Sequence, residues 1–238
     1  MLKGKKVIIF DMDGTLIDSV GVWNDVDRAL IQRIRTDGGT DTPDVQIQRD
    51  EALRQFSKSA NPYVEYCGLL KNKYGSALSP EEIHTLRYDI AQHFLKNVVG
   101  YKPDADVFLR RLKEAGYTLV IATTTKRGNI DIYRTQNAQM MAKANIDDLF
   151  TLIYTREDAR EIKPNPEIYL RVMQELNALP EECLIFEDSL IGIEAAKRAG
   201  IQSVAVYDQY SDGEREQINA LADYQLESYT KLLEQEAV

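Results

Sequence analysis

Five short apolar runs along the chain predict β-strands. They are rich in Val, Ile, Leu and aromatic residues with little polar alternation, which is typical of strands covered on both faces. Between the later runs, apolar residues recur at helical spacing, and a glycine follows two of these segments where helices commonly end. The predicted strands are residues 6–10, 117–122, 149–154, 183–186 and 203–206, and the predicted helices are residues 104–115, 166–176 and 189–199. This alternation indicates a doubly wound, mostly parallel α/β sheet of the Rossmann-like kind.

The long stretch between the first and second runs breaks this alternation. It contains no convincing strand, and its apolar residues follow a helical period instead. Ser79-Pro80-Glu81-Glu82 predicts a helix start with an N-cap and a capping box, and the polar residues 36–43 predict a loop. The two clearest apolar faces are Trp23, Val26, Leu30 and Ile34, and Ile83, Leu86, Ile90 and Phe94. We therefore expect a helical domain at residues 17–97, inserted into an α/β core made of residues 1–16 and 98–238.

The net charge of the chain argues against some classes of binding partner. The chain has 238 residues, of which 44% are hydrophobic, and a formal net charge of −9. This balance argues against a generally basic nucleic-acid or membrane-surface binder, so we expect neither partner. From residue 207 onwards, eight acidic residues face only Arg215 and Lys231. We interpret that segment as a solvated acidic surface with helices.

Cysteine usage and the first residues bear on location. Cys67 and Cys183 lie far apart, so neither a disulfide framework nor a zinc-ligand spacing is available, and Cys183 is expected in the core. The apolar run after the basic start ends at Asp11, which is too short for a signal peptide. No run approaches the roughly 20 apolar residues of a membrane helix. We expect a reduced, cytoplasmic, monomeric protein.

Polar side chains follow four of the predicted strands. Ligands of an open parallel sheet bind outside the carboxyl ends of its strands, so these residues should converge on one edge. The four groups are Asp11-Met12-Asp13-Gly14-Thr15, Thr123-Thr124-Thr125-Lys126, Lys163-Pro164-Asn165-Pro166 and Glu187-Asp188-Ser189. The prediction of a functional site depends on all four groups lying together, because each group alone has an ordinary structural explanation.

The carboxylates of Asp11 and Asp13 point to the same side of an extended chain. Close carboxylates repel, and they persist only with a cation, a shared proton or exposure to water. Asp188, from another strand end, could join Asp11 around Mg²⁺, which is usually held by a few protein oxygens and water. Taken singly, the first pair also fits a polar strand-to-helix turn, and Asp188 also fits a helix N-cap. Glu187 either reaches the metal through water or faces the helix layer.

Thr123 and Lys163 are candidates for binding a phosphoryl group. The hydroxyl and nearby amides at the end of a hydrophobic strand could hold a phosphoryl oxygen, and Thr124 is included in this set. A lysine among three acids would help neutralise both a nucleophilic carboxylate and a phosphoryl group. An ordinary strand threonine and a surface lysine before a helix remain the simpler alternatives.

Together these motifs resemble the haloacid dehalogenase superfamily of phosphohydrolases, in the branch with a helical cap after the first strand. Asp11-Met12-Asp13-Gly14-Thr15 matches the first motif, Thr123 the second, Lys163 the third and Glu187-Asp188 the fourth. The resemblance implies a Mg²⁺-dependent phosphatase acting on a small phosphorylated metabolite, such as a sugar or sugar-acid phosphate.

The same resemblance implies a role for each site residue. Asp11 would attack phosphorus and Asp13 would act as general acid and base. Mg²⁺ would be held by the Asp11 side chain, the Asp13 backbone carbonyl and Asp188. Thr123, Thr124 and Lys163 would bind the phosphoryl group, and the helical domain would close over the site.

Three other activities fit the motifs less well. Superfamily dehalogenases lack the second aspartate, whereas Asp13 is present here. In β-phosphoglucomutases a histidine follows the nucleophile at the start of the cap, where this chain has Trp23, so a sugar-phosphate mutase is the less favoured enzyme. A non-catalytic phosphate-binding module is the third alternative. Specificity could come from the basic residues of the helical domain, which include Arg49, Arg54, Lys58, Lys71 and Lys73.

Overall fold

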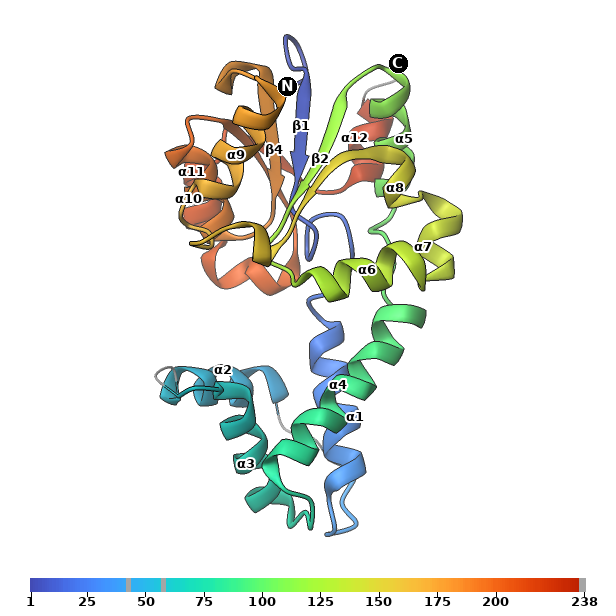
Figure 1. The fold of residues 1–238 in the computed structure, drawn as a ribbon, viewed down its shortest axis with the longest axis vertical. Coiled ribbons are helices and arrows are strands. Elements are labelled where there is room, and N and C mark those ends of the chain that lie inside the picture. Colours follow the sequence, from blue (N-terminus) through green and yellow to red (C-terminus); the bar gives the residue numbers. More distant parts are fainter. Residues whose placement is uncertain (42–43, 57–58, 236–238) are drawn as a thin grey trace. The chain divides into compact units, whose positions relative to one another are not determined.

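The computed structural model describes residues 1–41, 44–56 and 59–235, without the side chains of Asp50 and Arg54. The chain forms two compact units, of which one joins Met1–Val20 to Val99–Val238 and the other is Gly21–Val98. Both are drawn in Figure 1. Residues 17–20, which the sequence-based division assigned to the helical domain, belong to the first unit. Lys58, the Arg54 side chain and residues 42–43 of the expected loop lie outside the described residues.

The first unit is built on a six-stranded parallel sheet with strand order β3-β2-β1-β4-β5-β6. The predicted doubly wound α/β fold is therefore confirmed, and this strand order is that of the Rossmann fold. The short edge strand β6 was not predicted from sequence because three residues give too little periodicity. The strands are β1 (Val7–Phe10), β2 (Thr118–Ala122), β3 (Phe150–Tyr154), β4 (Cys183–Glu187), β5 (Gln202–Val206) and β6 (Tyr224–Leu226).

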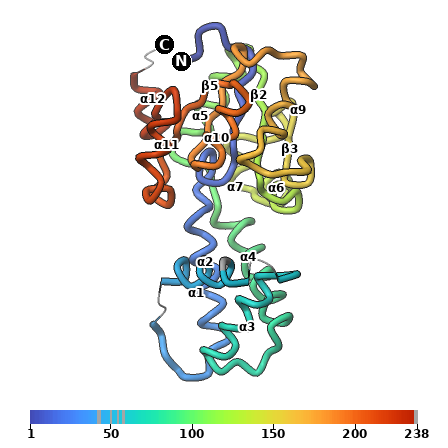
Figure 2. Tube along the Cα trace, turned by 90° about the vertical axis from the view of Figure 1, so that its left-hand side faces the viewer, coloured from blue at the N-terminus to red at the C-terminus, as the bar shows by residue number. Residues whose placement is uncertain are grey.

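Helices cover both faces of this sheet (Figures 1 and 2). The helices of the first unit are α5 (Ala105–Glu114), α6 (Arg127–Thr135), α7 (Ala138–Lys143), α8 (Ile146–Leu149), α9 (Glu167–Leu176), α10 (Leu190–Arg198), α11 (Arg215–Leu221) and α12 (Tyr229–Gln235). Short 3-10 helices span Arg156–Asp158, Pro180–Glu182 and Gln209–Glu214. The apolar side chains of α9 and α10 pack with Val7 and Ile9 on one face of the sheet. On the other face, Phe108 of α5 contacts Phe10 and Phe186.

Within its described residues, the second unit contains four helices, α1 (Val22–Ile34), α2 (Val45–Gln55), α3 (Pro62–Tyr74) and α4 (Pro80–Asn97). The predicted start of α4 is confirmed: Ser79 Oγ accepts the Glu82 amide at 3.1 Å, and Glu82 Oε2 accepts the Ser79 amide at 2.7 Å. The predicted apolar face of α4 packs on the core of this unit, since Ile83 is buried and Leu86 and Ile90 are partly buried against it. The buried stripe also includes Arg87, which was not predicted.

Arg87 is buried because it meets a buried aspartate. Asp27 of α1 is fully buried, and its two oxygens accept Arg87 Nε at 2.6 Å and Arg49 Nη1 at 2.6 Å. The Arg87 guanidinium also lies 5.2 Å from the ring centroids of Trp23 and Tyr63. One carboxylate thus links α1, α2 and α4, and its buried negative charge is paired with two guanidinium groups.

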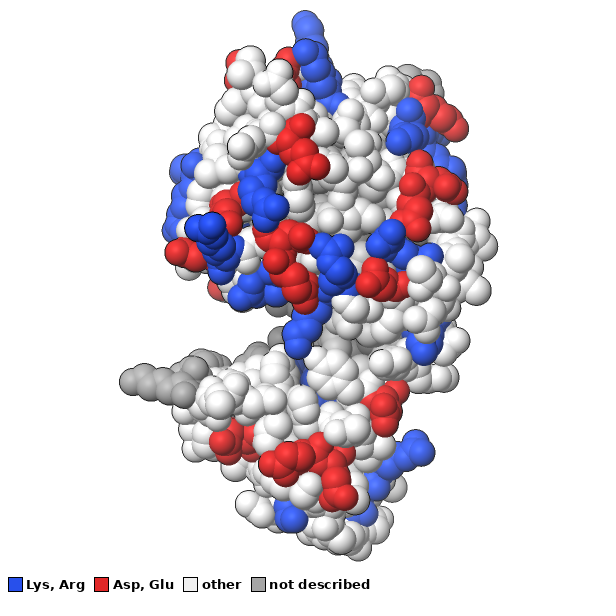
Figure 3. All heavy atoms as spheres, in the orientation of Figure 1, with Lys and Arg blue, Asp and Glu red and all other residues white. Residues whose placement is uncertain are grey.

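Charged side chains of both signs are interspersed on the face of the first unit seen in Figure 3. None of the helices within the described residues combines the length and the apolar character needed to cross a bilayer.

Replacing Asp27 with Asn should destabilise the protein strongly. The change leaves two arginines without their buried counter-ion, and removing one partner of a buried ion pair typically costs about 3–5 kcal/mol. Urea unfolding followed by circular dichroism measures the loss. The matched control is Asp25→Asn, because Asp25 forms an exposed pair with Arg28 at 2.7 Å, and such pairs contribute less than about 1 kcal/mol. Equal losses in the two variants would contradict the role given to Asp27.

Candidate active site

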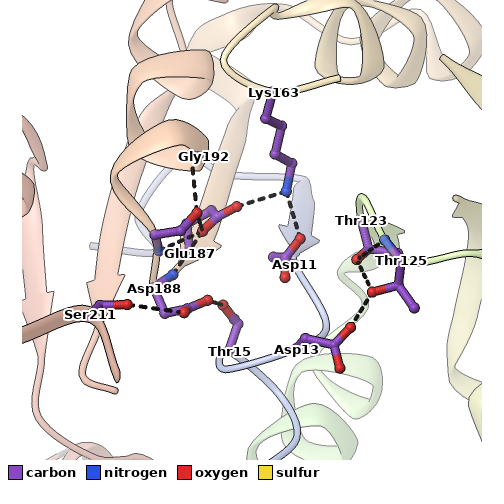
Figure 4. Close-up of polar contacts among 11 residues, drawn as sticks. Asp11, Asp13, Thr15, Thr123, Thr125, Lys163, Glu187, Asp188, Gly192 and Ser211 are labelled. Carbon is purple, nitrogen blue, oxygen red and sulfur yellow. Dashed lines mark hydrogen bonds and ion pairs between the residues drawn. The ribbon is translucent and has the colours of Figure 1, made fainter. Parts of the chain in front are cut away.

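The site lies where the strand order reverses, between β1 and β4. These strands are parallel neighbours in register, with Phe10 opposite Phe186. Asp11 directly follows β1, and Asp188 directly follows Glu187 at the end of β4. Ligands of doubly wound sheets bind at such a reversal point. The structure therefore brings Asp11 and the fourth-motif acids together, as Figure 4 shows.

Lys163 links two of these carboxylates. It comes from the loop between β3 and α9, and its Nζ donates to Asp11 Oδ1 at 2.6 Å and to Glu187 Oε1 at 2.7 Å. All three side chains are buried, so the alternative of a surface lysine is wrong. Among the described residues, Asp11 Oδ2 receives no hydrogen bond, which leaves this oxygen available for chemistry.

Burial and neighbouring charges shift the pKa values of the ionisable groups in this cluster. Burial raises the pKa of Asp11 to about 7, although the nearby Lys163 ammonium opposes the shift. Burial, followed by the negative charges of Glu187 and Asp11, raises the pKa of Asp188 well above its usual range. For Lys163, burial lowers the pKa, but the carboxylates of Asp11 and Glu187 more than offset this and raise it. Three carboxylates thus face one ammonium, and a divalent cation would supply the missing positive charge.

Glu187 is held by the protein itself. Its Oε2 accepts the backbone amides of Asp188 and Ser189 and the Ser189 hydroxyl, each at 2.9 Å, while Oε1 binds Lys163. Gly192 of α10 makes room for this carboxylate, since a Cβ on Gly192 would lie 1.8 Å from Glu187 Oε1. Glu187 therefore braces Lys163 and the turn after β4.

Asp188 faces the loop after β1. Its Oδ1 accepts Thr15 Oγ1 at 2.8 Å, and its Oδ2 accepts Ser211 Oγ at 3.5 Å. Gly14 adopts φ +79°, and a Cβ there would lie 2.4 Å from Asp188 Oδ2, so both the turn and the close approach require glycine. The helix N-cap is Ser189, which accepts the Gly192 amide at 3.2 Å, so the alternative role of Asp188 as the N-cap is wrong.

Asp13 is held by two hydroxyls that the sequence analysis missed. Ser19 Oγ donates to Asp13 Oδ1, and Thr125 Oγ1 donates to Asp13 Oδ2. Burial raises the pKa of Asp13, and these two hydrogen bonds oppose the shift. Thr125 belongs to the polar group predicted at the end of β2, but the bend at residues 124–125 that brings it to Asp13 leaves no periodic signal in the sequence. Ser19 follows a turn, and its spacing carries no such signal.

Thr123 directly follows β2, which neighbours β1 on the side away from β4, so it lies on the opposite side of Asp11 from Asp188 (Figure 4). The Thr123 hydroxyl donates to Thr125 Oγ1 and accepts the Thr125 amide, both at 3.1 Å. Thr123, Thr124 and Lys163 lie around one space that is too small to admit a water molecule. Thr124 is half-buried and belongs to none of the hydrogen bonds found at the site.

The residues 1–41, 44–56 and 59–235 contain no group of three or more His, Cys, Asp or Glu side chains arranged to hold a metal ion. The predicted ligand set is of a different composition, because it uses two carboxylates, Asp11 and Asp188, and the backbone carbonyl of Asp13. The buried negative charge at these carboxylates fits a cation.

Comparison with known proteins decides the family. The model of the haloacid dehalogenase-like hydrolases matches residues 8–206. The chain belongs to this family. It is 31% identical over 203 residues to a Bacillus subtilis protein provisionally named phosphatase YhcW, covering 84% of this chain and 83% of the relative. It is 26% identical to the phosphorylated carbohydrates phosphatase of Thermotoga maritima, covering 87% of this chain and 88% of the relative.

A solved structure agrees in fold. A Thermotoga maritima protein provisionally described as a β-phosphoglucomutase superposes with a TM-score of 0.77 at 24% identity, over 97% of this chain and 99% of that chain. The predicted resemblance is thus confirmed. The prediction of a hydrolytic enzyme of the phosphoric monoester class is confirmed as well, since curated relatives in this hydrolase family are named phosphatases.

Replacing Gly192 with Ala should disrupt the brace formed by Glu187. The new methyl group would overlap the Glu187 carboxylate, and overpacking of this kind typically costs about 1–3 kcal/mol. Gly128 offers a matched control, since it also lies in a helix and a Cβ there would meet nothing within 4 Å. Gly128→Ala should be neutral or stabilising by up to about 1 kcal/mol. Thermal unfolding compares the two, and a neutral Gly192→Ala would disprove the close approach.

Proposed function

We propose that this haloacid dehalogenase-like hydrolase is a Mg²⁺-dependent phosphatase that acts on a small phosphorylated metabolite through an aspartyl-phosphate. The main support is the buried cluster of the Asp11, Glu187 and Asp188 carboxylates and the Lys163 ammonium, at the point where the strand order reverses. Such a cluster favours a bound cation, and the cation together with the Lys163 ammonium would attract the negatively charged oxygens of a phosphate monoester.

Asp11, Asp188 and the Asp13 carbonyl would hold Mg²⁺. Two observations support this set: burial and mutual repulsion disfavour the ionised carboxylates, and Gly14 lets the Asp188 carboxylate pack closely against the loop that follows Asp11 and Asp13. When bound, the ion lets a carboxylate approach a phosphate and stabilises the charge on the transferred oxygens.

Asp11 is the nucleophile in this proposal. A lone pair of its carboxylate forms a bond to phosphorus while the bond from phosphorus to the ester oxygen breaks. Lys163 fixes one Asp11 oxygen at 2.6 Å, which orients the carboxylate and leaves Oδ2 for the attack. The difficult displacement is thus divided into two easier ones.

Asp13 moves the protons. In the first step its carboxyl group gives a proton to the leaving alkoxide, which departs as the alcohol. In the second, its carboxylate takes a proton from water as the water oxygen attacks phosphorus and the bond to Asp11 breaks, which restores the Asp11 carboxylate and releases phosphate. Ser19 and Thr125 hold both Asp13 oxygens, so the group keeps one orientation through both steps.

Thr123, Thr124 and Lys163 would bind the phosphoryl group. The position of both threonines directly after β2, next to β1, supports this assignment, as does the position of Lys163 beside the nucleophile. For the substrate we propose a sugar or sugar-acid phosphate, a class supported by the Thermotoga maritima relative named for phosphorylated carbohydrates. We further propose that the enzyme works as a monomer in the cytoplasm.

The first test is phosphate release from a panel of phosphorylated metabolites with Mg²⁺. Asp11→Asn removes the nucleophile and should lower kcat by about 10³-fold or more. Chelation with EDTA should abolish release, and added Mg²⁺ should restore it. Glu216→Gln is the control, because Glu216 is exposed and outside the site. A non-catalytic phosphate-binding protein would show no difference between wild type and Asp11→Asn.

Thr125→Val tests the proton-transfer step. The variant frees Asp13 Oδ2, and we expect kcat to fall about 10-fold with little change in KM, since general acid–base catalysis typically contributes 10²–10⁴-fold and only its orientation is impaired. Thr135→Val is the control, because the exposed Thr135 hydroxyl bonds only its own helix, at the Asp131 carbonyl. A rise in KM with kcat unchanged would instead assign Thr125 to substrate binding.

A further inference from the structure

The C-terminal segment contributes a buried residue beside the site. Tyr229 begins α12 and is 1% exposed, and its hydroxyl donates to the Thr15 carbonyl oxygen at 3.1 Å. Burial raises the pKa of Tyr229 above its usual range, so the hydroxyl keeps the proton that it donates. The interpretation of residues 207–238 as a solvated acidic surface is thus incomplete. Asp208 is also buried there, paired with Lys102 at 2.8 Å.

Thr15 passes this contact on to Asp188. The residue is fully buried, and while its carbonyl receives the Tyr229 hydroxyl, its own Oγ1 donates to Asp188 Oδ1 at 2.8 Å. The backbone of Thr15 is therefore held by Tyr229 of α12, and the side chain of Thr15 holds the Asp188 carboxylate. The chain of hydrogen bonds joins residues that are 214 and 173 positions apart.

The ring of Tyr229 holds the hydroxyl in place. Its centroid lies 5.5 Å from that of Phe108 and 6.5 Å from that of Phe186. Phe186 precedes Glu187 on β4 and stacks on Phe10, which precedes Asp11, at 4.8 Å. Thr230 Oγ1 donates to Asp104 Oδ2, which ties the start of α12 to the segment before α5.

We propose that Tyr229 is a positioning residue for the metal-binding carboxylate Asp188, acting through Thr15. The proposal rests on the proposed function in one respect, namely that Asp188 holds Mg²⁺. The hydroxyl of Tyr229 fixes the Thr15 peptide, and the Thr15 hydroxyl fixes the orientation of Asp188. Partners of metal ligands commonly change metal affinity when they are lost, even though they never touch the ion.

The decisive variant is Tyr229→Phe, which keeps the ring and removes only the hydroxyl. Titration calorimetry with Mg²⁺, without substrate, should show affinity about 3- to 10-fold weaker than in wild type. This effect is smaller than the 10–100-fold typical for a direct partner of a ligand, because Tyr229 is one hydrogen bond further away. The matched control is Tyr101→Phe, since Tyr101 is also buried and donates to a backbone carbonyl, that of Ala144, at 2.7 Å.

Thermal unfolding without Mg²⁺ separates positioning from a loss of stability. Each tyrosine variant leaves one buried carbonyl without its donor, so both should lower Tm by about 2–4 °C. Only Tyr229→Phe should weaken Mg²⁺ binding. Equal Mg²⁺ affinity in wild type and Tyr229→Phe, or an equal loss in the two tyrosine variants, would overturn the proposal.

A double-mutant cycle tests the route through Thr15. Thr15→Val should weaken Mg²⁺ binding about 10-fold or more, because it removes the direct partner of Asp188. Adding Tyr229→Phe to Thr15→Val should then cost little more, whereas fully additive losses would show that Tyr229 does not act through Thr15. If the variants change Mg²⁺ affinity as expected but the wild type releases no phosphate, Tyr229 is a positioning residue and the proposed phosphatase activity is refuted. Absence of Mg²⁺ binding in the wild type would overturn both.

Discussion

Three carboxylates and one ammonium share the buried space at the carboxyl ends of β1 and β4. The repulsion among the carboxylates determines which partners the surrounding residues must supply. Lys163 can neutralise only part of this charge, and it does so by contacting Asp11 and Glu187 at once. Glu187 is further stabilised by backbone amides, whereas Asp188 receives only hydroxyl groups from the described residues. The remaining negative charge is therefore concentrated between Asp11 and Asp188, where the proposed cation would bind.

Neutral donors orient these acids without adding charge. Thr15 donates a hydroxyl hydrogen bond to Asp188 and Ser189 donates one to Glu187, while Ser19 and Thr125 donate to the two oxygens of the neighbouring Asp13. Glycines at positions 14 and 192 allow the carboxylates of Asp188 and Glu187 to approach the backbone closely. The helical unit has the opposite arrangement of charges, because the Asp27 carboxylate lies between the guanidinium groups of Arg87 and Arg49. In both units a buried charge persists because partners from several elements converge on it.

The net charge of −9 does not describe the site. The local field depends on which acids are buried, which are paired and where a cation would bind. Asp208 shows this on a small scale, because it belongs to the acidic C-terminal segment by sequence and yet forms a buried pair with Lys102. Overall acidity is thus compatible with an anionic substrate.

The sequence alone determined the sheet, five of its six strands and the strand ends that carry Asp11, Thr123 and Asp188, because hydrophobic periodicity and strand-end polarity are local properties. It also determined the cap of α4, whose partners are three residues apart. Arg87 escaped prediction because its burial depends on Asp27, 60 positions away. Ser19 and Tyr229 owe their places at the site to contacts between segments distant along the chain or beyond a turn, and the contact of Glu187 with Lys163 has the same origin. Only the tertiary structure decided these, since hydrogen-bond partners of buried groups are chosen by where the fold brings the chain back to itself.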